Sequence, residues 1–480
     1  MLKEQKTESA RSIALFVLVE SLEHGRKLNE VLREQQMIYQ YLPKQERSFL
    51  NRLCKGVTER VIELDYVIDQ FSKTKTQKLK PVIREILRMG VYQILYMTQV
   101  PDSAACNESV KLARKKGFAG LSGYVNGVLR SVVRNKDSIS YPDPSDLCNY
   151  LSVCYSLPEW LVEYELEMYG EEITENMAKA SLMESKTSIR VNRKKSSKEK
   201  LKKKLTEARI TVEEGRYAED CLVISGYDHV EQIPGFFEGE FQIQDESSML
   251  ACLAAGLGDG TLSFSKDKKL KILDVCASPG GKTLYLSELV GEYGMVSARD
   301  LTESKVERIE ENIERMQADN VEVKVWDATV PDEEILSRNE QERYDLVLAD
   351  LPCSGLGVLG KKSDIKGRIR REDLTDLKEL QKQILSVVAD YVRPGGILIY
   401  STCTVNEGEN TENAEEFLDC HPDFQKYDIR KHLPKPLLLD EETIKKEYER
   451  YPFNSDNAIQ IIQGLYPMDG FFISGFQKKE

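Results

Sequence analysis

The sequence has 480 residues but only four histidines, two tryptophans and no Cys-x-x-Cys pair among its ten cysteines. The spacing that zinc sites and dithiol redox motifs need is therefore missing. No apolar run is long enough to cross a bilayer, and the first residues, MLKEQKTESARS, lack the apolar core of a signal peptide. We expect a cytoplasmic protein with reduced cysteines, no metal site and no membrane partner.

Charge is distributed unevenly along the chain. The net charge is −13, but residues 1–140 carry 24 Lys and Arg against 15 Asp and Glu, a net charge of +9, which leaves −22 for the rest. A basic segment on an acidic protein favours a polyanionic partner such as RNA. A well-solvated helical surface would give the same count, so charge alone leaves both interpretations open.

Hydrophobic periodicity divides the chain into three regions. Residues 8–136 repeat apolar side chains at three- and four-residue steps, which is typical of an all-α bundle. The following stretch, KDSISYPDPSD, predicts a linker, and after it helical segments mix with the strand-like segments SIRVN, ITVEEG and CLVIS. We expect a helical domain over 1–140, a small α+β domain over 145–240 and a third domain over 241–480.

Strand-like and helical segments alternate from residue 270 onward. The strand-like segments are KILDVC, GMVSAR, VEVKVW, YDLVLAD and GILIYST. This alternation implies right-handed crossovers and a parallel, doubly wound, Rossmann-like α/β sheet. Two later apolar runs, AIQIIQG and GFFISGF, are candidates for further strands. Ligands of such sheets lie beyond the carboxyl ends of the strands, so functional residues are expected there.

The loop ILDVCASPGGKT (272–283) follows the first of these strands and allows two interpretations. Its final Gly-Lys-Thr fits the end of a P-loop that binds nucleotide phosphates. However, Cys276 stands where the first P-loop glycine belongs, and Pro279 removes one backbone N–H from a loop whose N–H groups should bind phosphate. The other interpretation is a loop that binds a nucleoside cofactor.

Acidic residues at the ends of the next strands favour the nucleoside cofactor. Asp300 ends the segment GMVSARD, where an acid that binds ribose hydroxyls is expected. Asp327 follows the next strand, in position for the adenine ring. Acids at successive strand ends favour S-adenosylmethionine over ATP, and a P-loop ATPase stays as the weaker alternative.

Two cysteines directly follow strands that border the expected cleft: Cys353 in ADLPCSG and Cys403 in STCTVNEGEN. One such cysteine is usually a buried structural thiol, but two indicate chemistry. Methylation at carbon 5 of a pyrimidine needs a thiolate that adds to carbon 6. It also needs an acid that hydrogen-bonds the cytosine ring, and Asp350 is well placed for this role. The spacing does not show which cysteine is the nucleophile. Methyltransferases that act on amino nitrogens carry Asp or Asn, two prolines and then an aromatic residue that stacks on the base. Here Cys353 stands at the position of that aromatic residue, which argues against attack by an exocyclic amine.

These motifs resemble those of a known family. QDESS, DVCASPGGKT, DLPCSG, DIKG, RPGGILIYSTCTVNEGEN and DGFFI are similar to the bacterial 16S rRNA cytosine-C5 methyltransferases of the Sun/RsmB family. ARSIAL, VPDSAACNESVKLARK and YVNGVLR resemble the RNA-binding helical domain of the antiterminator NusB. The resemblance implies a class I methyltransferase that uses S-adenosylmethionine on small-subunit ribosomal RNA, either free or in a partly assembled subunit. A tRNA cytosine-5 methyltransferase is the nearest alternative, and a non-enzymatic RNA binder would need only the first domain.

The resemblance also implies roles for individual residues. Cys403 would be the nucleophile, Cys353 would help release the product, and Asp350 would contact the cytosine. The residues implied for the cofactor are Cys276, Ala277, Ser278, Pro279, Gly280, Gly281, Lys282, Asp300, Asp327 and Asp350.

Overall fold

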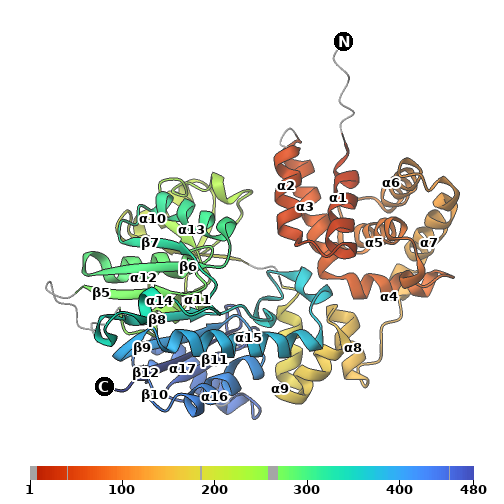
Figure 1. The fold of residues 1–480 in the computed structure, drawn as a ribbon. Coiled ribbons are helices and arrows are strands. Elements are labelled where there is room, and N and C mark those ends of the chain that lie inside the picture. The colour runs from red at the N-terminus through yellow and green to blue at the C-terminus, as the bar shows by residue number, and fades with distance from the viewer. Residues whose placement is uncertain (1–7, 40–41, 184–185, 258–268, 453) are drawn as a thin grey trace. The chain divides into compact units, whose positions relative to one another are not determined.

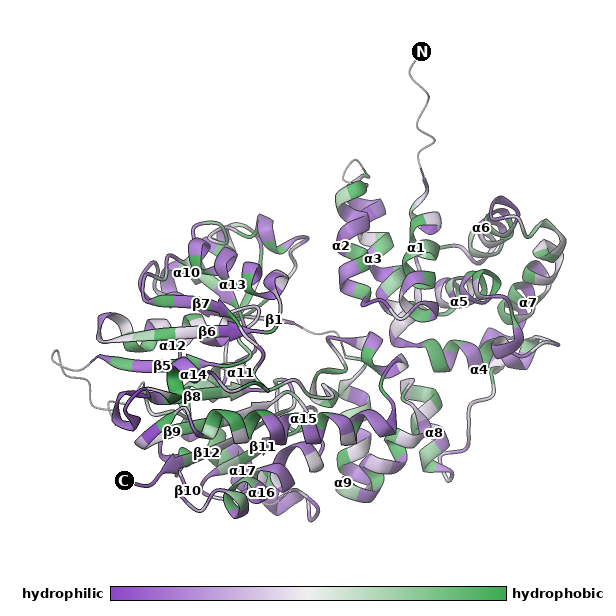
Figure 2. Cartoon of the chain, in the orientation of Figure 1, coloured by the Kyte–Doolittle hydropathy of each residue, from purple (hydrophilic) through white to green (hydrophobic). Residues whose placement is uncertain are grey.

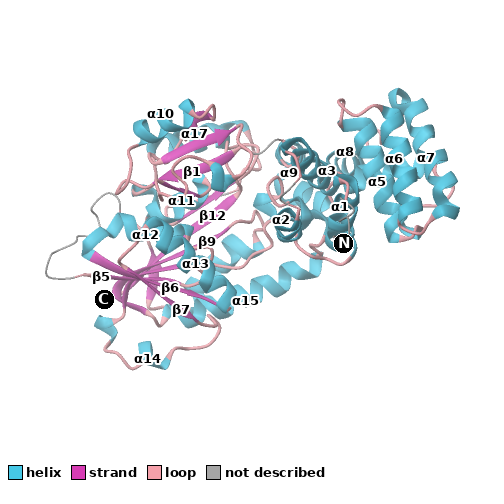
Figure 3. Cartoon of the chain, turned by 90° about the horizontal axis from the view of Figure 1, so that it is seen from above, coloured by secondary structure: helices cyan, strands magenta, loops and turns pink. Residues whose placement is uncertain are grey.

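The chain folds into two compact units. The computed structural model describes residues 8–39, 42–183, 186–257, 269–452 and 454–480, so most of the polar start discussed above lies outside the described residues. One unit comprises residues 1–183 with 359–369, and the other comprises 184–358 with 370–480. The strands lie in the second unit, whereas the first is built of helices (Figure 1, Figure 3). Within the described residues, none of the helices combines the length and the apolar character that crossing a membrane requires.

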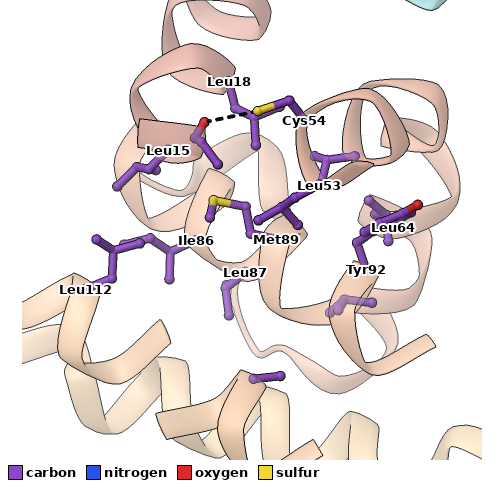
Figure 4. Packing of buried hydrophobic residues seen from close by; sticks show 14 of the residues in the cluster. Leu15, Leu18, Leu53, Cys54, Leu64, Ile86, Leu87, Met89, Tyr92 and Leu112 are labelled. Carbon is purple, nitrogen blue, oxygen red and sulfur yellow. Dashed lines mark hydrogen bonds between the residues drawn. The ribbon is translucent and has the colours of Figure 1, made fainter. Parts of the chain in front are cut away.

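Nine α-helices of the described residues form the first unit, and the first seven of them share one apolar core. They are α1 (Ala10–Leu18), α2 (Leu28–Ile38), α3 (Lys44–Glu59), α4 (Val61–Phe71), α5 (Pro81–Tyr96), α6 (Asp102–Lys115), α7 (Ser122–Asn135), α8 (Leu147–Tyr155) and α9 (Glu159–Ala180). Pro81 occupies the first turn of α5, where its missing N–H and fixed φ are tolerated. Ile86, Leu87 and Met89 of α5 are buried in the core with side chains of α1, α3, α4 and α6 (Figure 4). The predicted all-α N-terminal bundle is confirmed.

Two interruptions of the helices were not predicted. The continuous apolar pattern of ERSFLNRLCKGVTERVIELDYVIDQF breaks at Arg60 (φ −121°, ψ 23°), so α3 ends and α4 begins on either side of it. α9 bends at Gly170, whose φ of 75° is accessible to glycine at little cost. α8 and α9 cluster with the preceding helices, so the compact units divide near residue 183. The predicted boundaries of evolutionary domains at 140 and 240 stay predictions.

A short segment from much later in the sequence belongs to the first unit. It contains the 3₁₀ turn Ser363–Gly367, which also contacts α3. The buried Lys366 of this turn donates hydrogen bonds to the Tyr155 carbonyl (3.3 Å) and to Ser181 Oγ (3.1 Å). Burial lowers the pKa of Lys366 to about 7, and the nearby carboxylate of Glu59 opposes that shift.

The second unit contains a small antiparallel sheet with the strand order β2-β3-β1-β4. Its strands are β1 (Thr187–Val191), β2 (Thr211–Glu214), β3 (Cys221–Ser225) and β4 (Phe241–Ile243), and the helix that follows β1 is α10 (Lys198–Glu207). Leu201 and Leu205 of α10 are buried against Ile189, Leu222 and Phe241 of the sheet. The three strands predicted for the small α+β domain therefore form, and β4 completes their sheet.

The large sheet has the order β10-β12-β9-β8-β5-β6-β7, with β11 paired to β12. Its strands are β5 (Leu270–Asp274), β6 (Gly294–Asp300), β7 (Val321–Val325), β8 (Tyr344–Asp350), β9 (Val392–Thr402), β10 (Phe424–Lys426), β11 (Ala458–Ile461) and β12 (Phe471–Lys478). Its helices are α11 (Glu246–Leu253), α12 (Gly281–Val290), α13 (Glu303–Met316), α14 (Glu333–Leu336), α15 (Arg371–Ala389), α16 (Asn413–Cys420) and α17 (Lys435–Glu447).

The five predicted strands β5–β9 are parallel to one another, and β12 is antiparallel to its neighbour β9. The central strands carry apolar residues, while the surrounding helices alternate between apolar and hydrophilic residues (Figure 2). This pattern is expected for a parallel sheet that is covered on both faces. The predicted Rossmann-like methyltransferase fold is confirmed.

Candidate active site

The sheet reverses its strand order between β5 and β8. From β5 the chain continues to β6 on one side, and from β8 it continues to β9 on the other. The loops that follow β5 and β8 therefore diverge, which opens the crevice where doubly wound sheets bind ligands. The residues predicted for the site are on these loops and at the ends of β6, β7 and β9.

The glycine loop after β5 is fastened to the end of β6. The Ala277 amide donates to the Arg299 carbonyl (2.9 Å), and the Ser278 amide donates to Asp300 Oδ2 (2.9 Å). Gly280 has a φ of +98° and immediately precedes α12. The main chain of the loop is thus held against the end of β6.

Carboxylates and ammonium groups both lie around this loop. Burial raises the pKa of Asp274 to about 7; the hydrogen bond from Thr283 and the charge of Lys282 oppose the rise, and the charges of Asp350 and Asp300 add to it. Burial also raises the pKa of the Cys276 thiol, again with contributions from Asp300, Asp274 and Asp350. Cys276 is therefore no thiolate at neutral pH.

The two predicted ribose and adenine acids differ in their surroundings. Asp300 is buried and accepts hydrogen bonds from the Ser278 amide (2.9 Å) and from Lys305 Nζ (2.8 Å). Asp327 is exposed after β7 and accepts from the amide (2.9 Å) and hydroxyl (2.7 Å) of Thr329, which lower its pKa. The two acids end adjacent strands, but Asp327 lies at the far side of the sheet from β8 and does not reach the cysteines.

Asp350, at the end of β8, is held by two side chains. Lys282 Nζ donates to its Oδ2 (2.7 Å), and Ser401 Oγ of the paired strand β9 donates to its Oδ1 (2.8 Å). Burial would lower the pKa of Lys282, but the Asp350 carboxylate more than offsets this and keeps the pKa above its ordinary value. The ammonium group also lies 5.2 Å from the centre of the Phe471 ring. The geometry therefore fixes this acid in place beside the crevice.

The two cysteines face each other across the ends of β8 and β9. Their Sγ atoms are 3.3 Å apart. A hydrogen bond between the Ser354 and Thr404 hydroxyls (2.7 Å) and one from the Gly357 amide to the Cys403 carbonyl (3.1 Å) hold their loops side by side. The hydrogen bond with Cys403 raises the pKa of Cys353, and burial adds to the rise.

Comparisons with known proteins cover nearly the whole chain. The family model described as 16S rRNA methyltransferase RsmB/F matches residues 261–477, the NusB family model matches 8–134, and a ferredoxin-like domain model of RsmF/B-like methyltransferases matches 157–231. A protein of Bacillus subtilis (strain 168), described as "Probable ribosomal RNA small subunit methyltransferase B", is 35% identical over 99% of this chain and 100% of its own. The chain belongs to the ribosomal RNA small subunit methyltransferase B family.

Other family members and a solved structure agree. A methyltransferase B of Synechocystis sp. (strain ATCC 27184 / PCC 6803 / Kazusa), described in the same words, is 30% identical over 98% of this chain and 99% of its own. The crystal structure of PH0851 shares the fold, with a TM-score of 0.78 and 24% identity over 98% of this chain and 99% of that chain. Family membership makes the chain a methyltransferase, and it removes the P-loop ATPase and the non-enzymatic RNA binder as interpretations.

The sequence did not predict every side-chain contact of the candidate site. Lys282 was predicted as a cofactor residue; its ammonium group pairs with Asp350, and its part in cofactor binding stays a prediction. Ser401 and Glu409 were not singled out, although both lie in the segment RPGGILIYSTCTVNEGEN on which the family resemblance rested. That segment was the available signal for them, whereas the contact of Lys282 with Asp350 depends on how α12 lies beside the end of β8.

Proposed function

We propose that this methyltransferase transfers a methyl group from S-adenosylmethionine to carbon 5 of a cytidine in 16S ribosomal RNA, through a covalent bond between Cys403 and carbon 6. The observation that carries the proposal is the pair of facing thiols, 3.3 Å apart, next to an acid that is paired with a lysine, at the ends of adjacent strands. The full-length relatives described as small-subunit ribosomal RNA methyltransferases support the RNA substrate. The matching NusB domain and the basic helical region support RNA binding.

The charges around the glycine loop fit a nucleoside cofactor better than a nucleoside triphosphate. Lys282 pairs with Asp350 and Lys305 pairs with Asp300, so neither ammonium group is free to bind the phosphates of ATP. We assign the loop from Cys276 to Lys282, together with Asp300, Asp327 and Asp350, to the cofactor. When bound, S-adenosylmethionine supplies an electrophilic methyl group.

Cys403 would activate the cytosine, and the residues around Cys403 would position that base. The Cys403 thiolate forms a bond to carbon 6, and the electron pair of the C5–C6 double bond makes carbon 5 nucleophilic. Asp350, held in place by Lys282 and Ser401, hydrogen-bonds the polar edge of the cytosine. A base, for which solvent water suffices, then takes the proton from carbon 5, and the electron pair of that C–H bond re-forms the C5–C6 double bond. The C6–S bond breaks at the same time and its electrons return to Cys403, while the S–H of Cys353 stabilises the departing sulfur.

Two substitutions test this chemistry. We expect Cys403→Ala to abolish methylation while calorimetry still shows cofactor binding, because the nucleophile alone is lost. We expect Cys353→Ala to accumulate an RNA–protein adduct that survives a denaturing gel, because release of the sulfur is slowed. Cys420→Ala, an exposed position outside the site, is the control and should behave as the wild type. An adduct in Cys403→Ala but none in Cys353→Ala would reverse the two roles.

The RNA class needs a separate experiment. Bisulfite sequencing of RNA from a deletion strain, before and after incubation with the enzyme, should show one or more small-subunit cytidines gaining the modification. Purified RNA and partly assembled subunits can be compared in the same assay. Modification of tRNA instead would favour the tRNA methyltransferase.

A further inference from the structure

A buried carboxylate joins the two cysteine loops. Glu409, in the helical turn Gly408–Glu412, is 0% exposed. Its Oε2 accepts hydrogen bonds from the amide of Ser354, the residue after Cys353 (2.9 Å), and from Gln381 Nε2 (2.9 Å), while its Oε1 accepts from Asn406 Nδ2 (3.1 Å). A single side chain therefore contacts the loop of Cys353 and the loop that follows Cys403.

The contacts of Glu409 fit an ionised carboxylate. All three groups that reach its oxygens are donors, whereas a protonated carboxyl would also need an acceptor. No Lys or Arg among the described residues pairs with it. Burial raises the pKa of Glu409, and the hydrogen bonds from Ser354, Gln381 and Asn406 oppose that rise. A buried charge without a countercharge is costly, so its retention beside the cysteines needs a reason.

Glu409 contacts the Cys353 loop closer to the cysteine than it contacts the Cys403 loop. Its Oε2 accepts from the amide of the residue directly after Cys353, whereas its partner on the other loop is Asn406, three residues after Cys403. After the hydrogen bond with Cys403 and burial, the negative charges of Cys403 and Glu409 further raise the pKa of Cys353. Tyr400 also contacts Glu409: its hydroxyl donates to the Glu409 carbonyl, and burial raises its pKa. A negative charge acts more strongly on the nearer group, so these contacts favour retention of the proton on Cys353.

We propose that Glu409 is the positioning residue that retains the proton on Cys353 and thereby leaves Cys403 as the nucleophile. The inference rests on the proposed function, because it explains why one of two facing thiols attacks the base. The pair loses one proton to solvent. The remaining proton stays on Cys353, which donates it as a hydrogen bond to the Cys403 thiolate. The electron pair of that thiolate then forms the bond to carbon 6, and Cys353 keeps its proton.

The test measures which thiol is ionised, without RNA or cofactor. The folded wild-type chain is alkylated briefly with iodoacetamide between about pH 6 and pH 10, and the modified peptides are quantified by mass spectrometry. We expect Cys403 to react at lower pH than Cys353. In Glu409→Gln, which keeps the size and most hydrogen bonds but removes the charge, the preference for Cys403 should fall about tenfold, equivalent to one pKa unit.

Matched variants separate charge from structure. Glu412→Gln removes a carboxylate from the same turn. The ion pair lost in this variant is the surface pair with Lys378 (2.6 Å), so the preference for alkylation of Cys403 should be unchanged. Glu409→Asp keeps the charge and should retain most of the preference. The buried Cys54 and Cys252 report folding, because they are alkylated only if the chain opens.

Three results would overturn the assignment: a wild-type chain in which Cys353 reacts at the lower pH, a folded Glu409→Gln variant with the wild-type preference, or equal losses in Glu409→Gln and Glu409→Asp. The wild-type measurement alone can reject the proposal even if Glu409→Gln does not fold. Absence of RNA methylation with a normal thiol preference would instead reject the proposed function.

Discussion

The contact between Lys282 and Asp350 shows, at the scale of single residues, how the fold prepares the site. The lysine comes from the start of α12 and the acid from the end of β8, and their side chains are 12% and 26% exposed. At such burial each charge depends on the other, because removing one partner leaves the second desolvated and unpaired. The pair therefore contributes to stability as well as to the proposed chemistry.

We predict strong coupling between these two side chains. Lys282→Met and Asp350→Asn should each lower the free energy of unfolding of the second unit by about 1–3 kcal/mol. The double variant should lose at least about 1 kcal/mol less than the sum of the single losses. Urea unfolding can be followed by the fluorescence of Trp326 after Trp160, which lies in the first unit, is replaced by Phe.

A surface pair supplies the control for this cycle. Lys378→Met removes the ion-pair partner of Glu412, which is 55% exposed against 26% for Asp350. This substitution should change the free energy of unfolding by less than about 1 kcal/mol. Additive losses in the Lys282 and Asp350 variants would mean that the two charges are screened by solvent, contrary to the burial described above.

The turn between β5 and α12 shows how a single element positions the cofactor loop. Gly280 has a φ of +98°, and a Cβ there would lie 3.3 Å from Ile309. Gly281 follows it with ordinary helical geometry, and a Cβ there would lie 3.7 Å from Gln244. The second glycine thus has room for a side chain, whereas the first is restricted by both conformation and packing.

Alanine substitutions should separate these two glycines. We expect Gly280→Ala to destabilise the second unit by about 1–2 kcal/mol, because a left-handed conformation is unfavourable with a Cβ. Gly281→Ala should be neutral or slightly stabilising, since alanine favours helix over glycine. The comparison is made by urea unfolding without cofactor, so that contacts with the cofactor do not contribute. Equal losses at the two positions would contradict the role assigned to the backbone of Gly280.

The strands and their parallel order could be predicted because buried parallel strands are continuous apolar runs. The helical break at Arg60 could not, because the apolar period continues across it. Acids and cysteines at strand ends were found because the carboxyl ends of strands lie together in such sheets. Side-chain partners such as Lys282 with Asp350, and the positions of Asp327 and Glu409, depend on how distant elements pack. The roles of all these site residues stay predictions.

At the scale of the whole molecule, the segment 359–369 determines how RNA binding by the helices should be tested. This segment follows the Cys353 loop in sequence but belongs to the first unit, where it contacts α3. Deleting residues 1–140 would remove α3 and leave the segment without these contacts. A loss of activity after such a deletion would therefore not identify an RNA surface, whereas reversing single surface charges leaves the packing intact.

Lys78 and Lys116 are suitable positions for charge reversal. Both side chains are exposed. The segments that carry them are adjacent, because the ammonium group of Lys80, two residues after Lys78, lies 5.5 Å from the ring centre of Phe118, two residues after Lys116. If this surface contacts RNA phosphates, Lys78→Glu and Lys116→Glu should each weaken binding at low salt and reduce the slope of log affinity against log salt by about 0.7–0.9. Lys431→Glu, 73% exposed in the second unit, changes net charge equally and should leave the slope unaltered. Equal effects of all three substitutions would show that RNA responds to total charge, and the basic helical surface would then have no specific part in binding.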